Sequence, residues 1–66
     1  MKAPTEKPKV KLIGTNGDAF AIIGKVSKAL RKAGADKEYV EKYMEESMAG
    51  DYDNVLVTAV DYVDVH

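Results

Sequence analysis

Hydrophobic and polar positions first alternate near the beginning of the chain. Residues 9–13, KVKLI, place lysines on one face of an extended chain and apolar side chains on the other. This period of two is typical of a half-buried strand. The pattern therefore predicts a short N-terminal strand, and residues 1–8, which show no periodicity, predict a flexible tail.

A helical spacing follows a glycine-rich turn. Residues 14–18, GTNGD, predict the turn, with Thr15 or Asn16 as the N-cap and Asp18 in the first helical turn. The apolar positions that then recur every three or four residues are Ala19, Ile22, Ile23, Val26, Leu30 and Ala33. They predict one amphipathic helix, closed by Gly34 in a left-handed conformation.

A row of small residues on this helix has two interpretations. It consists of Ala21, Gly24 and Ser27. Either another backbone approaches the helix closely there, or Gly24 is a tolerated glycine that costs up to about 1 kcal/mol relative to alanine.

Two further helices are predicted, each capped by an aspartate. Asp36 caps the second, whose apolar stripe is Tyr39, Val40, Tyr43, Met44 and Met48. Gly50 ends it and Asp51 caps the third, whose apolar positions are Tyr52, Val55, Leu56, Ala59, Val60 and Val63. Residues 55–58 are also β-prone, so a strand is the alternative there. Residues 62–65 predict a short C-terminal strand.

These elements define an α+β fold with a short strand, three helices and a C-terminal strand that can pair with the first. We expect residues 9–66 to form a single small domain. An isolated strand is not stable alone, so the first strand needs a partner. That partner is either the C-terminal strand or the same strand in a second copy.

Charge is divided unequally along the 66 residues. Residues 1–33 carry eight basic and two acidic residues, a net +6, whereas residues 34–66 carry two basic and nine acidic residues, a net −7. Such halves attract each other, within one fold or head-to-tail between copies. The charges either intersperse on the folded surface or leave a basic face for an acidic partner such as nucleic acid.

Motifs that carry chemistry are scarce. Residues 51–54, DYDN, have the opening spacing of a calcium loop, but Leu56 and Tyr62 stand where that loop needs Gly and Glu. The chain has no cysteine and one histidine, His66, and its serines lie in no nucleophile motif. We therefore predict no catalytic residues, no metal site, no cofactor and no enzymatic activity. Without a long apolar run, we expect a soluble cytoplasmic protein that does not enter membranes.

Three segments resemble a set of small uncharacterised proteins of bacteria and their phages. They are residues 11–24, KLIGTNGDAFAIIG, residues 49–52, AGDY, and residues 62–65, YVDV. Those proteins share a strand, a GT-x-G-x-AF turn into a helix, a GDY junction and an acidic end. The resemblance covers most of residues 9–65. It implies no activity, cofactor or site, but it points to an accessory role of mobile-element type.

Two functional hypotheses follow. The first is a protein–protein interaction module, homodimeric or bound to another protein, in which the surface of the partner completes a marginal core. The predicted partner or nucleic-acid contacts are Lys9, Lys11, Lys25, Lys28, Arg31 and Lys32. The alternative is a DNA-binding protein that resembles the ribbon-helix-helix type. Its groove-facing residues would be Lys9, Lys11 and Ile13, and its phosphate contacts Lys7 and Lys28. Proteins of this type insert into the major groove a pair of strands, one from each copy of a dimer. If the first strand pairs within its own chain, that pair of strands cannot form.

Overall fold

Three helices and two very short strands make up the protein. The computed structural model describes residues 2–12 and 19–65. The elements are β1 (Lys9–Val10), α1 (Ala19–Lys32), α2 (Lys37–Ser47), α3 (Tyr52–Tyr62) and β2 (Asp64–Val65). This confirms the predicted α+β class and the order of its elements. The predicted turn and caps at Thr15, Asn16 and Asp18, and Ile13 of the first strand, lie outside the described residues.

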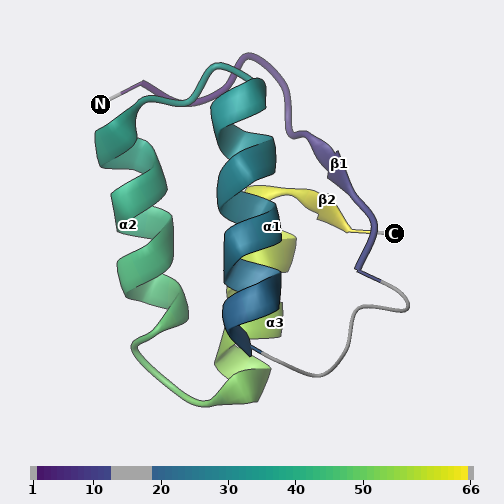
Figure 1. Cartoon of the computed structure of the whole chain (residues 1–66), viewed down its shortest axis with the longest axis vertical. Helices are drawn as coiled ribbons and strands as arrows, with labels where there is room; N and C mark the ends of the chain where they lie inside the picture. The colour runs from purple at the N-terminus through teal and green to yellow at the C-terminus, as the bar shows by residue number, and fades with distance from the viewer. Residues whose placement is uncertain (1, 13–18, 66) are drawn as a thin grey trace.

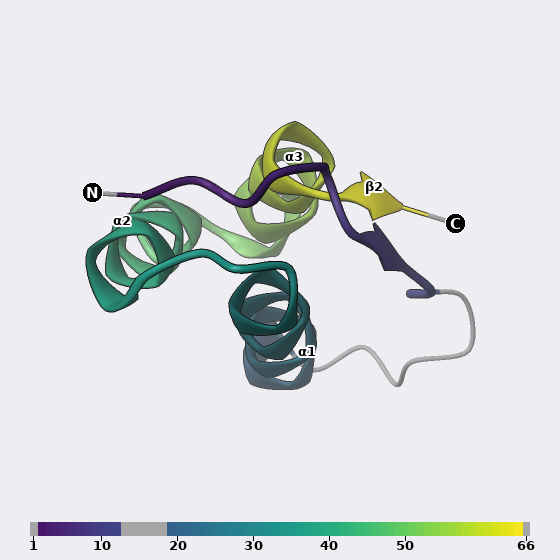
Figure 2. The same ribbon diagram turned by 90° about the horizontal axis from the view of Figure 1, so that it is seen from above.

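The helices run up, down and up beside one another, and the strands close one side (Figure 1). Seen from above, α2 adjoins both α1 and α3, whereas β1 and β2 lie on the opposite side, next to α1 and α3 (Figure 2). The strands are parallel, with Lys9 paired to Asp64 and Val10 paired to Val65. The first strand thus finds its partner in its own chain.

Local sequence signals explain where the helices begin and end. The side chains of Asp36 and Asp51 accept hydrogen bonds from the backbone N–H groups of Tyr39 (2.9 Å) and Asn54 (3.2 Å), so both predicted N-caps are confirmed. The Tyr39 hydrogen bond holds the pKa of the Asp36 carboxyl below its ordinary value. Gly34 adopts φ 101°, the left-handed conformation predicted after α1.

One core lies between the three helices and the strands. Its buried hydrophobic residues are Val10, Ile22, Ile23, Val26, Leu30, Ala35, Val40, Tyr43, Val55, Ala59 and Val63. The stripe of α1 is confirmed, with Ala19 and Ala33 half-buried at its ends. Tyr62 packs against Tyr39 and Tyr43, with ring centroids 5.4 and 5.2 Å apart, and so joins α3 to α2.

Parts of the predicted stripes and bounds are wrong. Met48 and Val60 are 52% and 57% exposed, whereas Thr58, outside the predicted stripe, is buried. The tertiary arrangement decides this, because α3 turns the Thr58 side of its surface toward the other helices. The strands are two residues each, shorter than predicted, and Tyr62 belongs to α3 rather than to β2.

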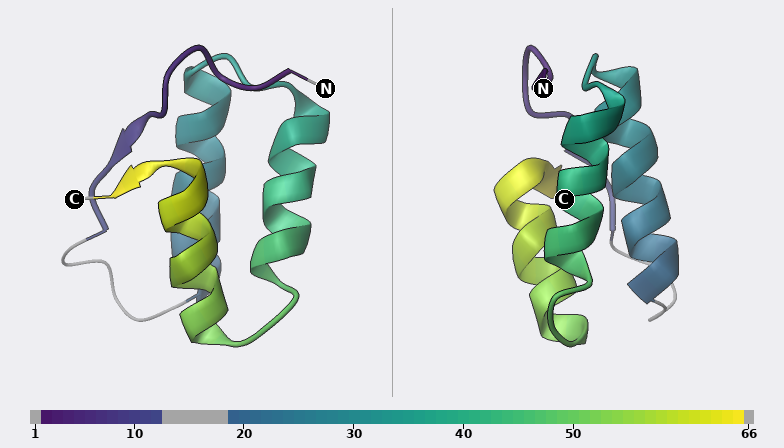
Figure 3. Two further views of the ribbon diagram at one scale, coloured as in Figure 1. Left: turned by 180° about the vertical axis from the view of Figure 1, so that it is seen from behind. Right: turned by 90° about the vertical axis from the view of Figure 1, so that its left-hand side faces the viewer.

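The segment before β1 lies across the end of the bundle where α1 ends and α2 begins (Figure 3). The backbone N–H of Lys2 donates to Asp36 Oδ2 (2.8 Å), and the N–H of Asp36 donates to the Lys2 carbonyl (3.1 Å). Further along, the N–H of Asp64 donates to the Pro8 carbonyl (2.9 Å). Residues 2–8 therefore contact the domain at both ends of the segment. Their flexibility stays a prediction.

Candidate functional site

The six cations predicted as contacts are all exposed, and they fall into two groups. Lys25, Lys28, Arg31 and Lys32 lie on α1, which carries no acidic residue. Lys9 lies in β1 and Lys11 follows it. Among residues 2–12 and 19–65, none of these cations forms an ion pair; the ion pair found there joins Lys37 Nζ to Glu41 Oε1 at 4.0 Å. The positive charge of α1 is therefore not neutralised within the described chain.

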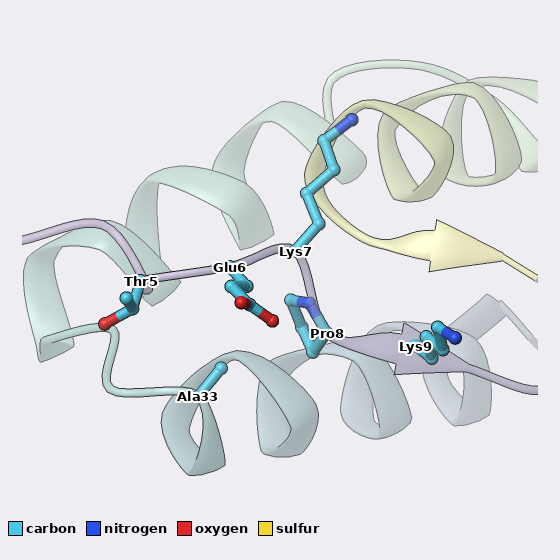
Figure 4. Close-up of a pocket in the computed structure, with 6 residues that line it drawn as sticks. All are labelled: Thr5, Glu6, Lys7, Pro8, Lys9 and Ala33. Atoms are coloured by element: carbon cyan, nitrogen blue, oxygen red, sulfur yellow. The ribbon is translucent and has the colours of Figure 1, made fainter.

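Lys9 borders a hollow that makes a poor binding site. The hollow, of about 510 Å³, is lined by Thr5, Glu6, Lys7, Pro8, Lys9 and Ala33. Figure 4 shows that Lys7 extends away from Ala33, on the opposite side of the segment. The two lysines do not converge on one point, and a carboxylate, that of Glu6, also lines the hollow. Nothing in this arrangement would hold an anion.

A second hollow, of about 300 Å³, lies where the start of α1 meets the junction of α2 and α3. Its lining is mainly apolar and includes Phe20, Ile23, Met48, Tyr52 and Val55. Phe20 and Met48 are 74% and 52% exposed. Exposed large apolar side chains that gather at one place mark interaction surfaces more often than those scattered singly. The sequence pattern did not predict this cluster, because Phe20 lies outside the apolar stripe of α1 and Met48 was assigned to the apolar stripe of α2.

The cluster and two of the cations share one face of α1. At 3.6 residues per turn, Phe20, Gly24, Lys28 and Arg31 fall within an arc of about 80°. All four are exposed. Because Phe20 and Met48 line the same hollow, this side of α1 adjoins α2. Lys25 and Lys32 lie on the other side of α1.

The matching face of α2 carries acids and methionines. Lys37, Glu41, Met44, Glu45 and Met48 fall within an arc of about 100° on that helix, and Lys37 forms an ion pair with Glu41. Tyr39, Tyr43 and Glu46 contact Tyr62 of α3 instead, so they face the other way. We call the combined surface the α1–α2 face; it comprises Phe20, Gly24, Lys28, Arg31, Lys37, Glu41, Met44, Glu45 and Met48. At its apolar end the face adjoins α3, because Tyr52 and Val55 line the same hollow as Phe20 and Met48.

Gly24 lies in the middle of this face and is open. A Cβ atom added there would meet nothing within 4 Å. No backbone of the described chain approaches Gly24, so the interpretation of the small-residue row as an internal packing site is wrong. Ala21 is exposed as well, and only Ser27 of that row is buried.

Within the described residues, no three histidine, cysteine or acidic side chains gather as a metal site would require. No helix of that part of the chain is both long and apolar enough to cross a membrane. In comparisons with protein-family models, curated proteins and solved structures, nothing matched the chain. The resemblance to small phage and bacterial proteins therefore stays a hypothesis.

Proposed function

We propose that this protein is a small, non-enzymatic protein-binding module that binds its partner through the α1–α2 face. One observation carries the proposal. Phe20 and Met48 are exposed around an apolar hollow, and on the same face of α1 lie cations that form no ion pair with residues 2–12 or 19–65. Exposed apolar side chains flanked by charged groups on one surface are typical of a protein interface.

The mixed charge of the face favours a protein over a nucleic acid. Lys28 and Arg31 on α1 and Glu41 and Glu45 on α2 belong to the same face, so both signs are present on it. A phosphate backbone is attracted by cations and repelled by carboxylates, whereas a protein partner can match both. Binding to DNA through Lys9 and Lys11 is the weaker alternative, because β1 already pairs with β2 of its own chain.

The remaining parts of the proposal rest on the sequence. An accessory role of mobile-element type follows from the resemblance, and a cytoplasmic location without cofactor follows from the composition. These expectations do not depend on the α1–α2 face. Its failure as a binding surface would leave them standing.

The binding proposal can be tested with purified protein and two matched substitutions. Phe20→Ser removes the exposed apolar centre, and Lys25→Glu changes a charge on the other side of α1. Cross-linking and light scattering on the wild type should give a complex with itself or with another protein. That complex should be lost in Phe20→Ser and kept in Lys25→Glu. Monomers at high micromolar concentration together with no captured partner would contradict the proposal.

DNA binding has its own test. The alternative requires retardation of duplex DNA at low salt that weakens in Lys9→Ala and Lys11→Ala. Absence of retardation at low salt would remove this alternative.

A further inference from the structure

We infer that the hollow between α1, α2 and α3 receives one large apolar side chain of the partner protein, and that lysine or arginine flanks this side chain in the partner. The inference rests on the proposed function, since it names the chemistry of the partner at the apolar end of the α1–α2 face. It follows from where exposed apolar side chains gather and from which charges surround them.

The exposed apolar side chains are concentrated around the hollow. The described residues expose five large hydrophobic side chains, and Phe20, Met48 and Tyr52 among them line it. The other two, Val57 and Val60, lie on α3 outside its lining. Binding gains most where apolar surface leaves water, so the hollow is the part of the described surface that best accepts an apolar group.

The hollow has the size of a single side chain. Its volume of about 300 Å³ lies at the lower limit of small-molecule pockets. Ile23 and Val55 line it and are buried, so they form its floor. The polar side chains of its lining are those of Ser47, which is buried, and Asp51, which is exposed. An aromatic or long aliphatic side chain therefore fits it better than a charged one.

The charges next to the hollow are all negative. Residues 19–24 of α1 carry no charge, and residues 44–56 carry acidic residues alone, which are Glu45, Glu46, Asp51 and Asp53. Glu45 precedes Met48 by three positions, so the two side chains are neighbours on α2. Glu46 faces α3 instead, where it accepts the hydrogen bond from Tyr62. Glu45, Asp51 and Asp53 are exposed and form no ion pair with residues 2–12 or 19–65.

The cations of the adjoining helices lie too far away to neutralise these carboxylates. Lys28, on the same face of α1, lies about 12 Å along the axis from the first turn, and Lys25 lies on the other side of α1. On α2, Lys42 and Lys37 lie about 9 and 16 Å along the axis before Met48. Screening at physiological salt acts over about 8 Å, so the carboxylates set the local potential.

The helix dipoles do not reverse this sign. The N-termini of α1 and α3 and the C-terminus of α2 meet at this end of the bundle (Figure 1). Their partial charges of about half a unit each leave a net of about +0.5, which is less than the full charges of three carboxylates. The apolar hollow thus has a negative surround, which attracts lysine and arginine and repels phosphate groups. An arginine of the partner can also stack on the exposed ring of Tyr52.

The first test compares two capped tripeptides, lysine–tryptophan–lysine and glutamate–tryptophan–glutamate. The protein has no tryptophan, so selectively excited tryptophan fluorescence reports the state of the peptide. We expect the basic peptide to bind about fivefold or more tightly than the acidic one at about 0.05 M salt, and the difference to shrink at about 0.5 M. Equal binding of the two peptides, or no binding of either at millimolar concentration, would overturn the inference.

Substitutions of exposed apolar residues locate the binding site. Phe20→Ser and Tyr52→Ser should each weaken binding of the basic peptide by about tenfold. Val57→Ser is the matched control, because Val57 is 61% exposed but lies outside the hollow, and it should leave binding unchanged. A loss in Val57→Ser as large as that in Phe20→Ser would show unspecific adhesion and overturn the inference.

Neutral variants test the negative surround. Asp51→Asn removes the charge and keeps the N-cap of α3, because asparagine caps helices as well as aspartate does. It should weaken binding of the basic peptide by about two- to fivefold. Asp61→Asn removes the same charge about 15 Å away along α3 and should have no effect. A similar loss in both variants would mean that net charge alone acts, and would overturn the inference.

The outcomes separate this inference from the proposed function. A protein complex that is lost in Phe20→Ser, together with equal binding of the two peptides, would overturn the inference and leave the proposed function standing. Self-association that is lost in Phe20→Ser, with neither peptide bound, would do the same and would identify a second copy as the occupant. Absence of any complex and of peptide binding would contradict both.

Discussion

Three buried hydroxyl groups make no hydrogen bond of standard distance and angle within the described residues, although the Ser47 hydroxyl lies close enough to that of Tyr43 to oppose the rise in the Tyr43 pKa. They belong to Ser27 on α1 and to Tyr43 and Ser47 on α2. A buried polar group without a partner loses its hydrogen bonds to water and gains none in return, which costs about 1–3 kcal/mol. These residues therefore limit the stability of the contact between α1 and α2.

Removal of such a hydroxyl should not destabilise the protein. We expect Tyr43→Phe and Ser47→Ala to leave the free energy of unfolding unchanged or to raise it by up to about 1 kcal/mol, measured by urea denaturation. The matched contrast is Asp36→Ala, which removes a used N-cap and should lower it by about 1 kcal/mol. A loss in Tyr43→Phe as large as that in Asp36→Ala would show that the Tyr43 hydroxyl has a partner.

Tyr62 makes the stability depend on alkaline pH. Burial raises the pKa of its hydroxyl, and the hydroxyl also donates a hydrogen bond to Glu46 Oε2, which further favours the protonated form. Burial also raises the pKa of Tyr43. In the unfolded chain both tyrosines titrate near 10.0, so above that pH the unfolded state loses protons that the native state keeps.

The contribution of these tyrosines to the free energy of unfolding should therefore be constant below about pH 10 and fall as the pH rises above it. Urea titrations at increasing pH would measure the slope, and Tyr62→Phe should reduce it. The Glu46→Gln variant should keep a raised pKa at Tyr62, since burial is the first cause. A slope that is the same in wild type and Tyr62→Phe would contradict this assignment.

At the scale of elements, the junction between α2 and α3 depends on Gly50 and Asn54. The Asn54 side chain donates to the carbonyls of Glu46 (2.7 Å) and Ser47 (3.2 Å), and so satisfies the end of α2. A Cβ atom on Gly50 would lie 2.8 Å from Asn54 Cβ. Gly50 is therefore required for space, not for a left-handed conformation.

Substitution by alanine should have opposite effects at Gly50, between α2 and α3, and at Gly24, within α1. Gly50→Ala forces the α2–α3 junction apart and should lower the free energy of unfolding by about 1–3 kcal/mol. Gly24→Ala adds a methyl group in open space within α1 and should raise it by up to about 1 kcal/mol. Thermal and urea unfolding of the two variants, at concentrations where the chain is monomeric, would compare them. A similar loss in both variants would contradict the assignment of Gly50 to close packing.

For the whole molecule, the two ends of the chain are held on the same bundle. Residues 2–8 join the start of α2 through Lys2 and the start of β2 through Pro8, while β1 and β2 pair in parallel. A domain of this size buries only about 60% of the surface of its unfolded chain, less than larger domains do, so a few such contacts form an appreciable part of its stability.

Deletion of residues 1–7, which keeps Pro8, should lower the free energy of unfolding by about 1 kcal/mol. Lys2→Ala is the control and should be neutral, because Lys2 uses its backbone N–H and carbonyl in the two hydrogen bonds. Calorimetry on both variants would measure the difference. If the deletion leaves stability unchanged, the prediction of a flexible tail holds and the contacts of Lys2 add nothing to stability.

The sequence alone determined the number and order of the helices, the N-caps of α2 and α3 and the end of α1. These depend on neighbours within a few residues: Asp36 and Asp51 reach N–H groups three residues on, and Gly34 closes α1 through its own φ. The spacing of the apolar residues also predicted the buried face of α1 correctly, because they form a single stripe on that helix and its charged residues lie outside the stripe. Such signals are local, so no knowledge of the fold was needed.

Only the tertiary structure decided which side of α3 is buried, how β1 is paired and where the cations lie relative to Phe20. Thr58 is buried and Val60 is exposed because the positions of α1 and α2 decide which side of α3 faces the core. The sequence does not identify that side, since valines occur on all sides of α3. The pairing of β1 with β2 joins residues at opposite ends of the chain, a contact that no local pattern encodes. The α1–α2 face likewise exists only because two antiparallel helices bring their charges and apolar ends together.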